Sequence, residues 1–270
     1  IIISVIFVAS TWNVDLSVVY GWWLWAAMIL LGCVRVRFMG FSYAAGTISM
    51  LALASQWLDV TLNPMSRPWL ASLQTVDVGN LLLLAGVLTT VSGLLTLWGG
   101  DQSHCPVVLR RRGKPIGAVV LQAFWAVPVL LPTGDGWFIL PALLVYSDLA
   151  VARYAKQRAR LTGLWTVGFG ISLAVLSFIG SSSMELLWIG AIWALFGQEV
   201  ITRLSSRQEY NGVPKFRTSD HGVRVLGVKA SSRAQEMGIL PGEAITHANG
   251  QPVRNMTDLS IALQRSPAFC

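Results

Sequence analysis

Long apolar runs separated by short polar stretches restrict the fold of this chain more than any other feature. A helix needs about 20 mostly apolar residues to cross a bilayer. The pattern therefore predicts a polytopic α-helical membrane domain of about eight spans. Pro128, Pro132 and Pro141 interrupt the fifth and sixth runs, which would then be tilted, kinked or re-entrant, so six spans is the alternative. The eight runs cover residues 1–9, 16–34, 41–60, 78–98, 116–131, 137–151, 163–180 and 184–201.

Composition excludes several other classes of protein. Hydrophobic residues make up 54% of the chain and charged residues only 12%, about half the charge of a typical soluble domain. The net charge of +7 does not indicate nucleic-acid binding, because the basic residues fall between the apolar runs rather than on one face. The three cysteines, Cys33, Cys105 and Cys270, lack the spacing of a metal site. We expect the chain to lie in a lipid bilayer and to bind no metal, cofactor or nucleic acid.

Basic residues predict the orientation of the chain, since short loops rich in Lys and Arg stay in the cytoplasm. They follow the second, fourth, sixth and eighth runs, and of the 20 Lys and Arg residues only Arg67 falls in an intervening loop. This alternation predicts an even number of spans in the cell (inner) membrane and a cytoplasmic C-terminal tail.

A few polar or small residues inside the runs carry specific expectations. Asp148 and Glu199 lie near basic flanks, so we expect them to pair with Arg153 and Arg203 or to reach the interface. Asn80 and Gln122 could hydrogen-bond between helices. The fourth run also has a face of small residues suited to close helix packing, namely Gly86, Ser92 and Gly93.

Composition changes after residue 203, where charges of both signs mix with turn residues. Residues 222–228 alternate like a strand, 231–237 suit a short helix, and 244–248 form a second strand ending at the Asn249-Gly250 turn. Asn255 then opens a helix through Gln264. We expect a membrane domain over residues 1–203 and a cytoplasmic linker and small α+β domain over 204–270. The first residue is not Met, and we expect sequence to be missing at both ends.

The stretch GVRVLGVKASSRAQEMGILPGEAITHANGQPVRNMTDLSIALQ resembles a bacterial PDZ domain. The resemblance implies that an extended peptide adds to a sheet edge beside the closing helix. Leu259 and Leu263 would then line the groove or the core, and the carboxylate-holding loop would be formed by Tyr210, Asn211, Gly212 and Val213. The alternative for the latter residues is a linker turn. A final strand is absent, so the domain is expected to be incomplete.

Eight spans followed by a cytoplasmic PDZ domain resemble the MinJ-type cell-division proteins of bacteria. GVRVLGVKASSRAQEMGILPGE and the ending IALQRSPAFC carry this resemblance. It implies a membrane scaffold that bridges the polar protein DivIVA and the division inhibitor MinD in septum-site selection. Localisation would be septal or polar. From our own reading of the chain, we expect the membrane half to supply anchoring and self-association.

Two other functions stay open as alternatives. PDZ domains accompany membrane proteases, so the chain could be a regulatory or accessory protease subunit; a transporter with a regulatory PDZ tail ranks third. Catalysis by this chain itself is not expected, because its three histidines, His104, His221 and His247, all lie outside the apolar runs. A membrane metalloprotease would need two of them one turn apart on a membrane helix.

Overall fold

The fold was analysed in a computed structural model, which describes residues 18–58, 73–111, 114–133, 136–180, 183–217, 222–228 and 231–265. The predicted first span, residues 1–9, lies outside this range. The chain forms two compact units. The first comprises residues 1–101, 122–147 and 159–205, and the second comprises 102–121, 148–158 and 206–270. The predicted domain boundary after residue 203 stays a prediction.

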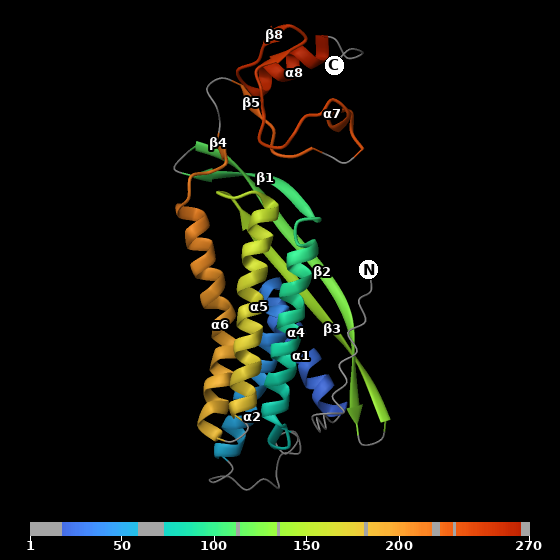
Figure 1. Ribbon diagram of the computed structural model, residues 1–270, viewed down its shortest axis with the longest axis vertical. Coiled ribbons are helices and arrows are strands. Elements are labelled where there is room, and N and C mark those ends of the chain that lie inside the picture. Colours follow the sequence, from blue (N-terminus) through green and yellow to red (C-terminus); the bar gives the residue numbers. More distant parts are fainter. Residues whose placement is uncertain are drawn as a thin grey trace. The chain divides into compact units, whose positions relative to one another are not determined.

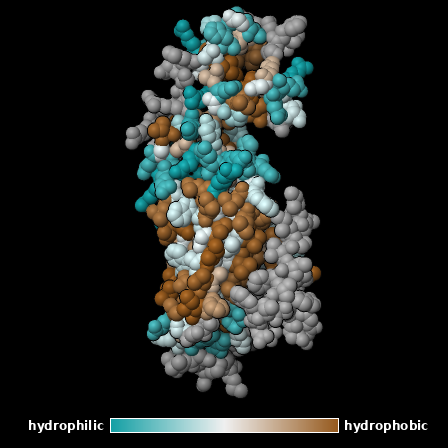
Figure 2. Space-filling model, viewed as in Figure 1, coloured by the Kyte–Doolittle hydropathy of each residue, from teal (hydrophilic) through white to brown (hydrophobic). Residues whose placement is uncertain are grey.

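In the part of the chain that the structure describes, five α-helices contribute to the first unit (Figure 1). Three of them, α4, α5 and α6, are long and apolar enough to cross a membrane, and α1 contains a shorter apolar helix over Gly21–Val34. Apolar side chains form a broad band over the visible helices (Figure 2), which is consistent with a membrane protein. The helices are α1 (Val18–Val34), α2 (Phe41–Leu58), α4 (Val78–Gly99), α5 (Ala155–Gly180) and α6 (Met184–Asn211), and a 3-10 turn, η2 (Val36–Met39), connects α1 to α2.

The fifth and sixth apolar runs are strands, so their prediction as membrane helices is wrong. They form β2 (Lys114–Thr133) and β3 (Gly136–Ala150), neighbours in one sheet. Prolines explain the difference, because Pro128 and Pro141 fall inside the two runs, where each would remove a helical hydrogen bond and clash with the preceding turn. Neither eight nor six spans is confirmed.

The β2–β3 hairpin packs against the helices of the first unit. Val127 and Val129 of β2 and Ala142 and Leu144 of β3 are buried in the same apolar cluster as Leu82 of α4. Figure 1 shows the two strands running beside the helices. The unit is therefore a helical bundle with a β-hairpin on its side.

Glycines bring α4 and α5 into close contact, which confirms the predicted small-residue face. A Cβ on Gly86 would lie 2.7 Å from the backbone nitrogen of Ala174, and one on Gly170 would lie 2.7 Å from the carbonyl oxygen of Gly86. Seven residues further along α4, a Cβ on Gly93 would lie 2.9 Å from the carbonyl oxygen of Gly163. Larger residues would force the two backbones apart.

Asn80, in contrast, does not connect two helices as predicted. It lies in the first turn of α4, where its backbone N–H donates to Asp77 Oδ1 at 3.0 Å and its side-chain Nδ2 donates to Asp77 Oδ2 at 2.7 Å. Asp77 is the N-cap of the helix. The amide of Asn80 therefore reinforces a local cap.

The second unit contains strand β1 and the first part of β2. Strand β1 (His104–Arg111) pairs antiparallel with β2 from His104↔Leu121 to Arg111↔Lys114. Strand β4 (Phe216–Arg217) pairs with Ile116 and Gly117 of β2. Ile116, Ala118 and Val151 form a small buried core under this sheet.

The C-terminal segment contains short strands and two helices. Strand β5 (Val223–Arg224) pairs with β6 (Ala244–Ile245), and β7 (His247–Ala248) pairs with β8 (Gln251–Pro252). The tight turn at Asn249-Gly250 is confirmed, with φ of 51° and 76°. Helices α7 (Arg233–Glu236) and α8 (Met256–Arg265) match the two predicted helices. The PDZ fold as a whole stays a prediction.

Candidate functional site

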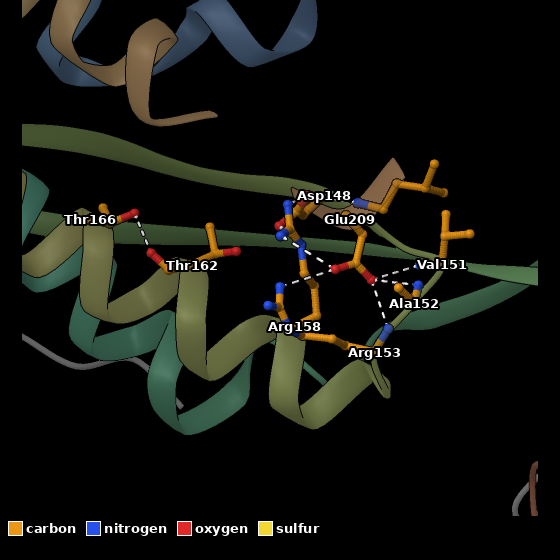
Figure 3. Close-up of polar contacts among 9 residues, drawn as sticks. Asp148, Val151, Ala152, Arg153, Arg158, Thr162, Thr166 and Glu209 are labelled. Atoms are coloured by element: carbon orange, nitrogen blue, oxygen red, sulfur yellow. Dashed lines mark hydrogen bonds and ion pairs between the residues drawn. The ribbon is translucent and has the colours of Figure 1, made fainter. Parts of the chain in front are cut away.

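Four charged side chains of the second unit form one cluster, which we call the Arg158 cluster: Asp148, Arg153, Arg158 and Glu209 (Figure 3). Asp148 lies near the end of β3, Arg153 in the turn that follows, Arg158 in the first turns of α5 and Glu209 near the end of α6. The cluster therefore connects three elements at the point where the apolar segments end.

Arg158 occupies the middle of the cluster and is only 1% exposed. Its Nε lies 2.8 Å from Asp148 Oδ2, and its Nη2 donates to Asp148 Oδ1 at 2.9 Å. On its other side, Nη1 lies 3.8 Å from Glu209 Oε2. A guanidinium suits this position because its planar fork matches a carboxylate with two parallel contacts. Two buried carboxylates thus share one buried cation.

Glu209 holds the turn between β3 and α5. Its Oε1 accepts three consecutive backbone N–H groups, those of Val151 at 2.9 Å, Ala152 at 2.7 Å and Arg153 at 2.8 Å. Its Oε2 also accepts a hydrogen bond from Arg153 Nη1 at 3.2 Å. Successive N–H groups that converge in a turn form an anion-binding concavity. Here the anion is a side chain from 56 to 58 residues further along the chain.

The segment after α6 returns to the same turn. The backbone N–H of Lys215 donates to the carbonyl oxygen of Val151 at 3.0 Å. Tyr154 packs edge-on against the buried ring of Phe216, with 6.4 Å between ring centroids, and Lys215 Nζ lies 5.3 Å from the centre of the Tyr154 ring. The chain leaving α6 is therefore attached to the turn by backbone, aromatic and cation–π contacts.

The chemistry of the cluster is structural. Its two carboxylates and two guanidinium groups balance in charge, and each carboxylate is already engaged by donors within the protein. No group of three or more His, Cys, Asp or Glu side chains that could hold a metal ion occurs among the described residues. The arrangement fixes where the C-terminal segment begins.

The sequence-based pairings are partly confirmed. Glu199 Oε1 accepts from Arg203 Nε at 2.9 Å, as predicted. Asp148, however, pairs with Arg158 and not with Arg153, which binds Glu209 instead. Arg158 falls in a stretch predicted to be a basic cytoplasmic loop, whereas the structure places it in α5 and buries it. Glu209 was not singled out, because a glutamate in the polar end of a long helix gives no signal in a single sequence.

The residues predicted for peptide binding lie in two places. Tyr210 and Asn211 end α6, and Gly212 and Val213 follow, with the Gly212 N–H donating to the Gln208 carbonyl oxygen at 3.2 Å. Leu259 and Leu263 lie on α8; Leu259 is partly buried and Leu263 is 40% exposed. Their assignment to a peptide groove stays a prediction.

Helix α8 is well defined at its start. Asn255 Oδ1 accepts the N–H of Asp258 at 2.8 Å, and Asp258 Oδ2 accepts the N–H of Arg254 at 3.1 Å, which resembles a capping box. Asn249 Nδ2 donates to the carbonyl oxygen of Ala262 at 3.0 Å and so attaches the β7–β8 turn to the helix. The helix thus presents its exposed side chains in a fixed orientation.

The fold and the site together are those of a mostly helical, membrane-type protein. A polar C-terminal segment follows its last long helix, α6. The chain is similar to the cell division topological determinant MinJ of Bacillus subtilis (strain 168), with 26% identity over 206 residues, covering 68% of this chain and 52% of that protein. The resemblance to MinJ-type proteins is confirmed, although the chain spans only about half of this relative's length.

Two further relatives extend the match. The probable cell division topological determinants MinJ of Lacticaseibacillus paracasei and of Lacticaseibacillus casei (strain BD-II) are each 25% identical over 277 aligned residues. These alignments cover 90% of this chain and 72% of each relative. No family model matches the chain. No solved structure matches it either.

Proposed function

We propose that this protein acts in division-site selection as a membrane-anchored adaptor, with its C-terminal segment recruiting partner proteins on the cytoplasmic side. One observation carries the proposal: the similarity to MinJ proteins covers 90% of the chain, so it includes the apolar helices and extends beyond them. The three helices of membrane-spanning length supply the anchor. The MinJ resemblance suggests a DivIVA-like polar scaffold and a MinD-like inhibitor as partners.

The exposed side of α8 is the surface we assign to recruitment. Leu263 is 40% exposed at a position where the PDZ resemblance expects groove contacts. Ile261 lies on the same helix and is 43% exposed, but is not among the residues assigned to the groove. The two residues therefore form a matched pair for a test, because an aspartate at either one adds the same charge at similar exposure.

The experiment follows a fluorescent fusion of the full-length protein in dividing cells. Leu263→Asp should disperse septal or polar foci into an even membrane signal, whereas Ile261→Asp should leave the foci intact. A truncation after Arg217 should also disperse them, and it preserves both β4 and the contacts of Glu209. An even membrane signal of the unaltered protein would contradict a role in division-site selection. Foci that survive the truncation would contradict recruitment by the C-terminal segment.

A further inference from the structure

The short sheet formed by β1 and the first part of β2 is apolar on both of its faces. Side chains alternate between the two faces along each strand. One face carries Ile116 and Ala118, which are buried together with Val151. In the middle of the other face, two apolar pairs lie opposite one another across the strands: Pro106↔Val119 and Val108↔Gly117. A sheet with one solvated face would alternate apolar and polar residues, so this pattern indicates that the second face is covered too.

Gly117 leaves space on this second face, and Leu226 of the C-terminal segment occupies it. A Cβ on Gly117 would overlap Leu226 Cδ2 and would lie 2.8 Å from Phe216 Cβ. A glycine inside a strand weakens it and often marks a site where another part of a structure approaches closely. The next residue approaches the same face, because a Cβ on Gly227 would lie 3.9 Å from Pro106 Cβ. Leu226 and Gly227 therefore lie against the second face of the sheet.

Further contacts attach the same part of the C-terminal segment. Arg224 Nη1 donates to the carbonyl oxygen of Lys215 at 2.9 Å. The carbonyl oxygen of Val225 accepts the N–H of Gly242 at 2.8 Å, and a Cβ on Gly242 would lie 3.7 Å from the Tyr154 hydroxyl. All of these residues belong to the second compact unit. The segment is therefore attached at the sheet, at the linker after α6 and at the turn after β3.

These contacts leave the recruiting side of α8 open, since Leu263 is 40% exposed. A short series of contacts connects the attached strand to that helix. Strand β5 pairs with β6, β7 follows after one residue, and Asn249 of the β7–β8 turn binds Ala262 of α8. The attachment at the sheet therefore sets the direction in which α8 presents Leu263.

We propose that the second face of the β1–β2 sheet is a docking surface for the protein's own C-terminal segment, with Leu226 over Gly117 as the anchor. Docking holds the recruiting side of α8 in one orientation relative to the sheet while a partner is bound. An apolar anchor suits this place, because Val108 and Val119 lie on the same face and burial of apolar surface favours the contact. The role in recruitment rests on the proposed function, whereas the docking itself does not.

A disulfide between Pro106→Cys and Gly227→Cys tests the docking in the full-length protein. The 3.9 Å between a Cβ on Gly227 and Pro106 Cβ lies within the roughly 3.5–4.5 Å that a disulfide needs. Cys33, Cys105 and Cys270 are first replaced by Ser, and isolated native membranes are then oxidised mildly. We expect an intramolecular disulfide in most molecules, identified by mass spectrometry of the linked peptides.

The matched control combines Pro106→Cys with Gly238→Cys. Gly238 belongs to the same segment, but a Cβ there meets nothing within 4 Å. This pair should stay reduced under the same oxidation. An equal yield from both pairs would mean that the cysteines meet by random motion, and it would overturn the docking.

Two substitutions, each made together with the first cysteine pair, test the anchor. Leu226→Ser removes the docked side chain without changing the sheet, and Gly117→Leu fills the space that Leu226 occupies. Both should remove most of the disulfide. Leu240→Ser is the control, since Leu240 lies in the same segment but is 61% exposed, and it should leave the yield unchanged. Undiminished disulfide in Leu226→Ser would overturn Leu226 as the anchor.

The role in recruitment is tested with fluorescent fusions of the full-length protein that keep the native cysteines. Leu226→Ser should disperse septal or polar foci, whereas Leu240→Ser should leave them intact. Foci that persist in Leu226→Ser would overturn the role of docking in recruitment. An even signal from the unaltered protein would instead contradict the proposed function, and the disulfide yield would still measure the docking.

Discussion

Arg158 and Asp148 are joined by two contacts, of 2.8 and 2.9 Å, although one belongs to α5 and the other to β3. Both side chains are buried, with 1% and 7% exposure. A buried ion pair contributes little net stability compared with apolar residues, but loss of one partner leaves a charge without compensation. The effect of this ion pair on stability is therefore largest when one of its two partners is removed.

Arg158→Met should destabilise the protein by about 3–5 kcal/mol, because Asp148 and Glu209 would lose their shared buried cation. The expected result is a lower midpoint of thermal unfolding in detergent. Arg203→Met is the matched control: Arg203 is 74% exposed and pairs with Glu199 one turn away, a contact worth about 0.5 kcal/mol or less. Equal losses in the two variants would contradict the importance of the cluster.

Glu209→Gln should loosen the turn after β3 without unfolding the protein. A neutral amide oxygen accepts hydrogen bonds more weakly than a carboxylate. Hydrogen–deuterium exchange should therefore become faster at the amides of Val151, Ala152 and Arg153. Gln208→Ala changes the neighbouring, exposed residue and should leave exchange at these amides unchanged. Unaltered exchange in Glu209→Gln would show that the carboxylate does not hold the turn.

Gly86→Ala should destabilise the bundle, since the new Cβ would lie 2.7 Å from the backbone nitrogen of Ala174. Gly168→Ala is the control, because a Cβ there meets nothing within 4 Å. Alanine favours a helix over glycine by up to about 1 kcal/mol, so this variant should be as stable as the parent or slightly more stable. Thermal unfolding in detergent compares the two. A similar effect of both would argue against close packing of α4 on α5.

Native Cys105 reports the orientation of the chain. It is exposed on β1, on the side predicted to be cytoplasmic. With Cys33 and Cys270 replaced by Ser, a membrane-impermeant thiol reagent should label Cys105 only after cells are opened. Glu185 lies in the first turn of α6, on the side predicted to be outside the cell. In a background without native cysteines, Glu185→Cys should therefore be labelled in intact cells. Labelling of Cys105 in intact cells would reverse the predicted orientation.

Local patterns in the sequence predicted several elements correctly. The fourth apolar run, which has no internal proline, corresponds to α4. The seventh and eighth runs lie within α5 and α6. The Asn-Gly turn at Asn249 and the start of α8 at Asn255 depend on backbone and capping preferences of a few adjacent residues. Glu199 and Arg203 are four residues apart on one helix, so their contact needs no knowledge of the fold.

The features that were missed depend on contacts between distant segments. Hydropathy alone treats residues 116–131 and 137–151 as helical spans, since apolar runs of this length do not distinguish a buried strand from a helix. Pro128 and Pro141 were the available signal. Asp148 was assigned to the nearer Arg153, and the choice of Arg158 follows only from how β3, α5 and α6 meet. Glu209 lies 58 residues from Val151, a distance at which a single sequence gives no information on contact.

The glycines between α4 and α5 are spaced seven residues apart on both helices, with Gly86 and Gly93 facing Gly170 and Gly163. Displacement of one helix by a single turn, about 5.4 Å, would bring side chains against backbone at both places at once. A piston-like movement of α4 along α5 is therefore opposed by steric clash at two places along the helix pair.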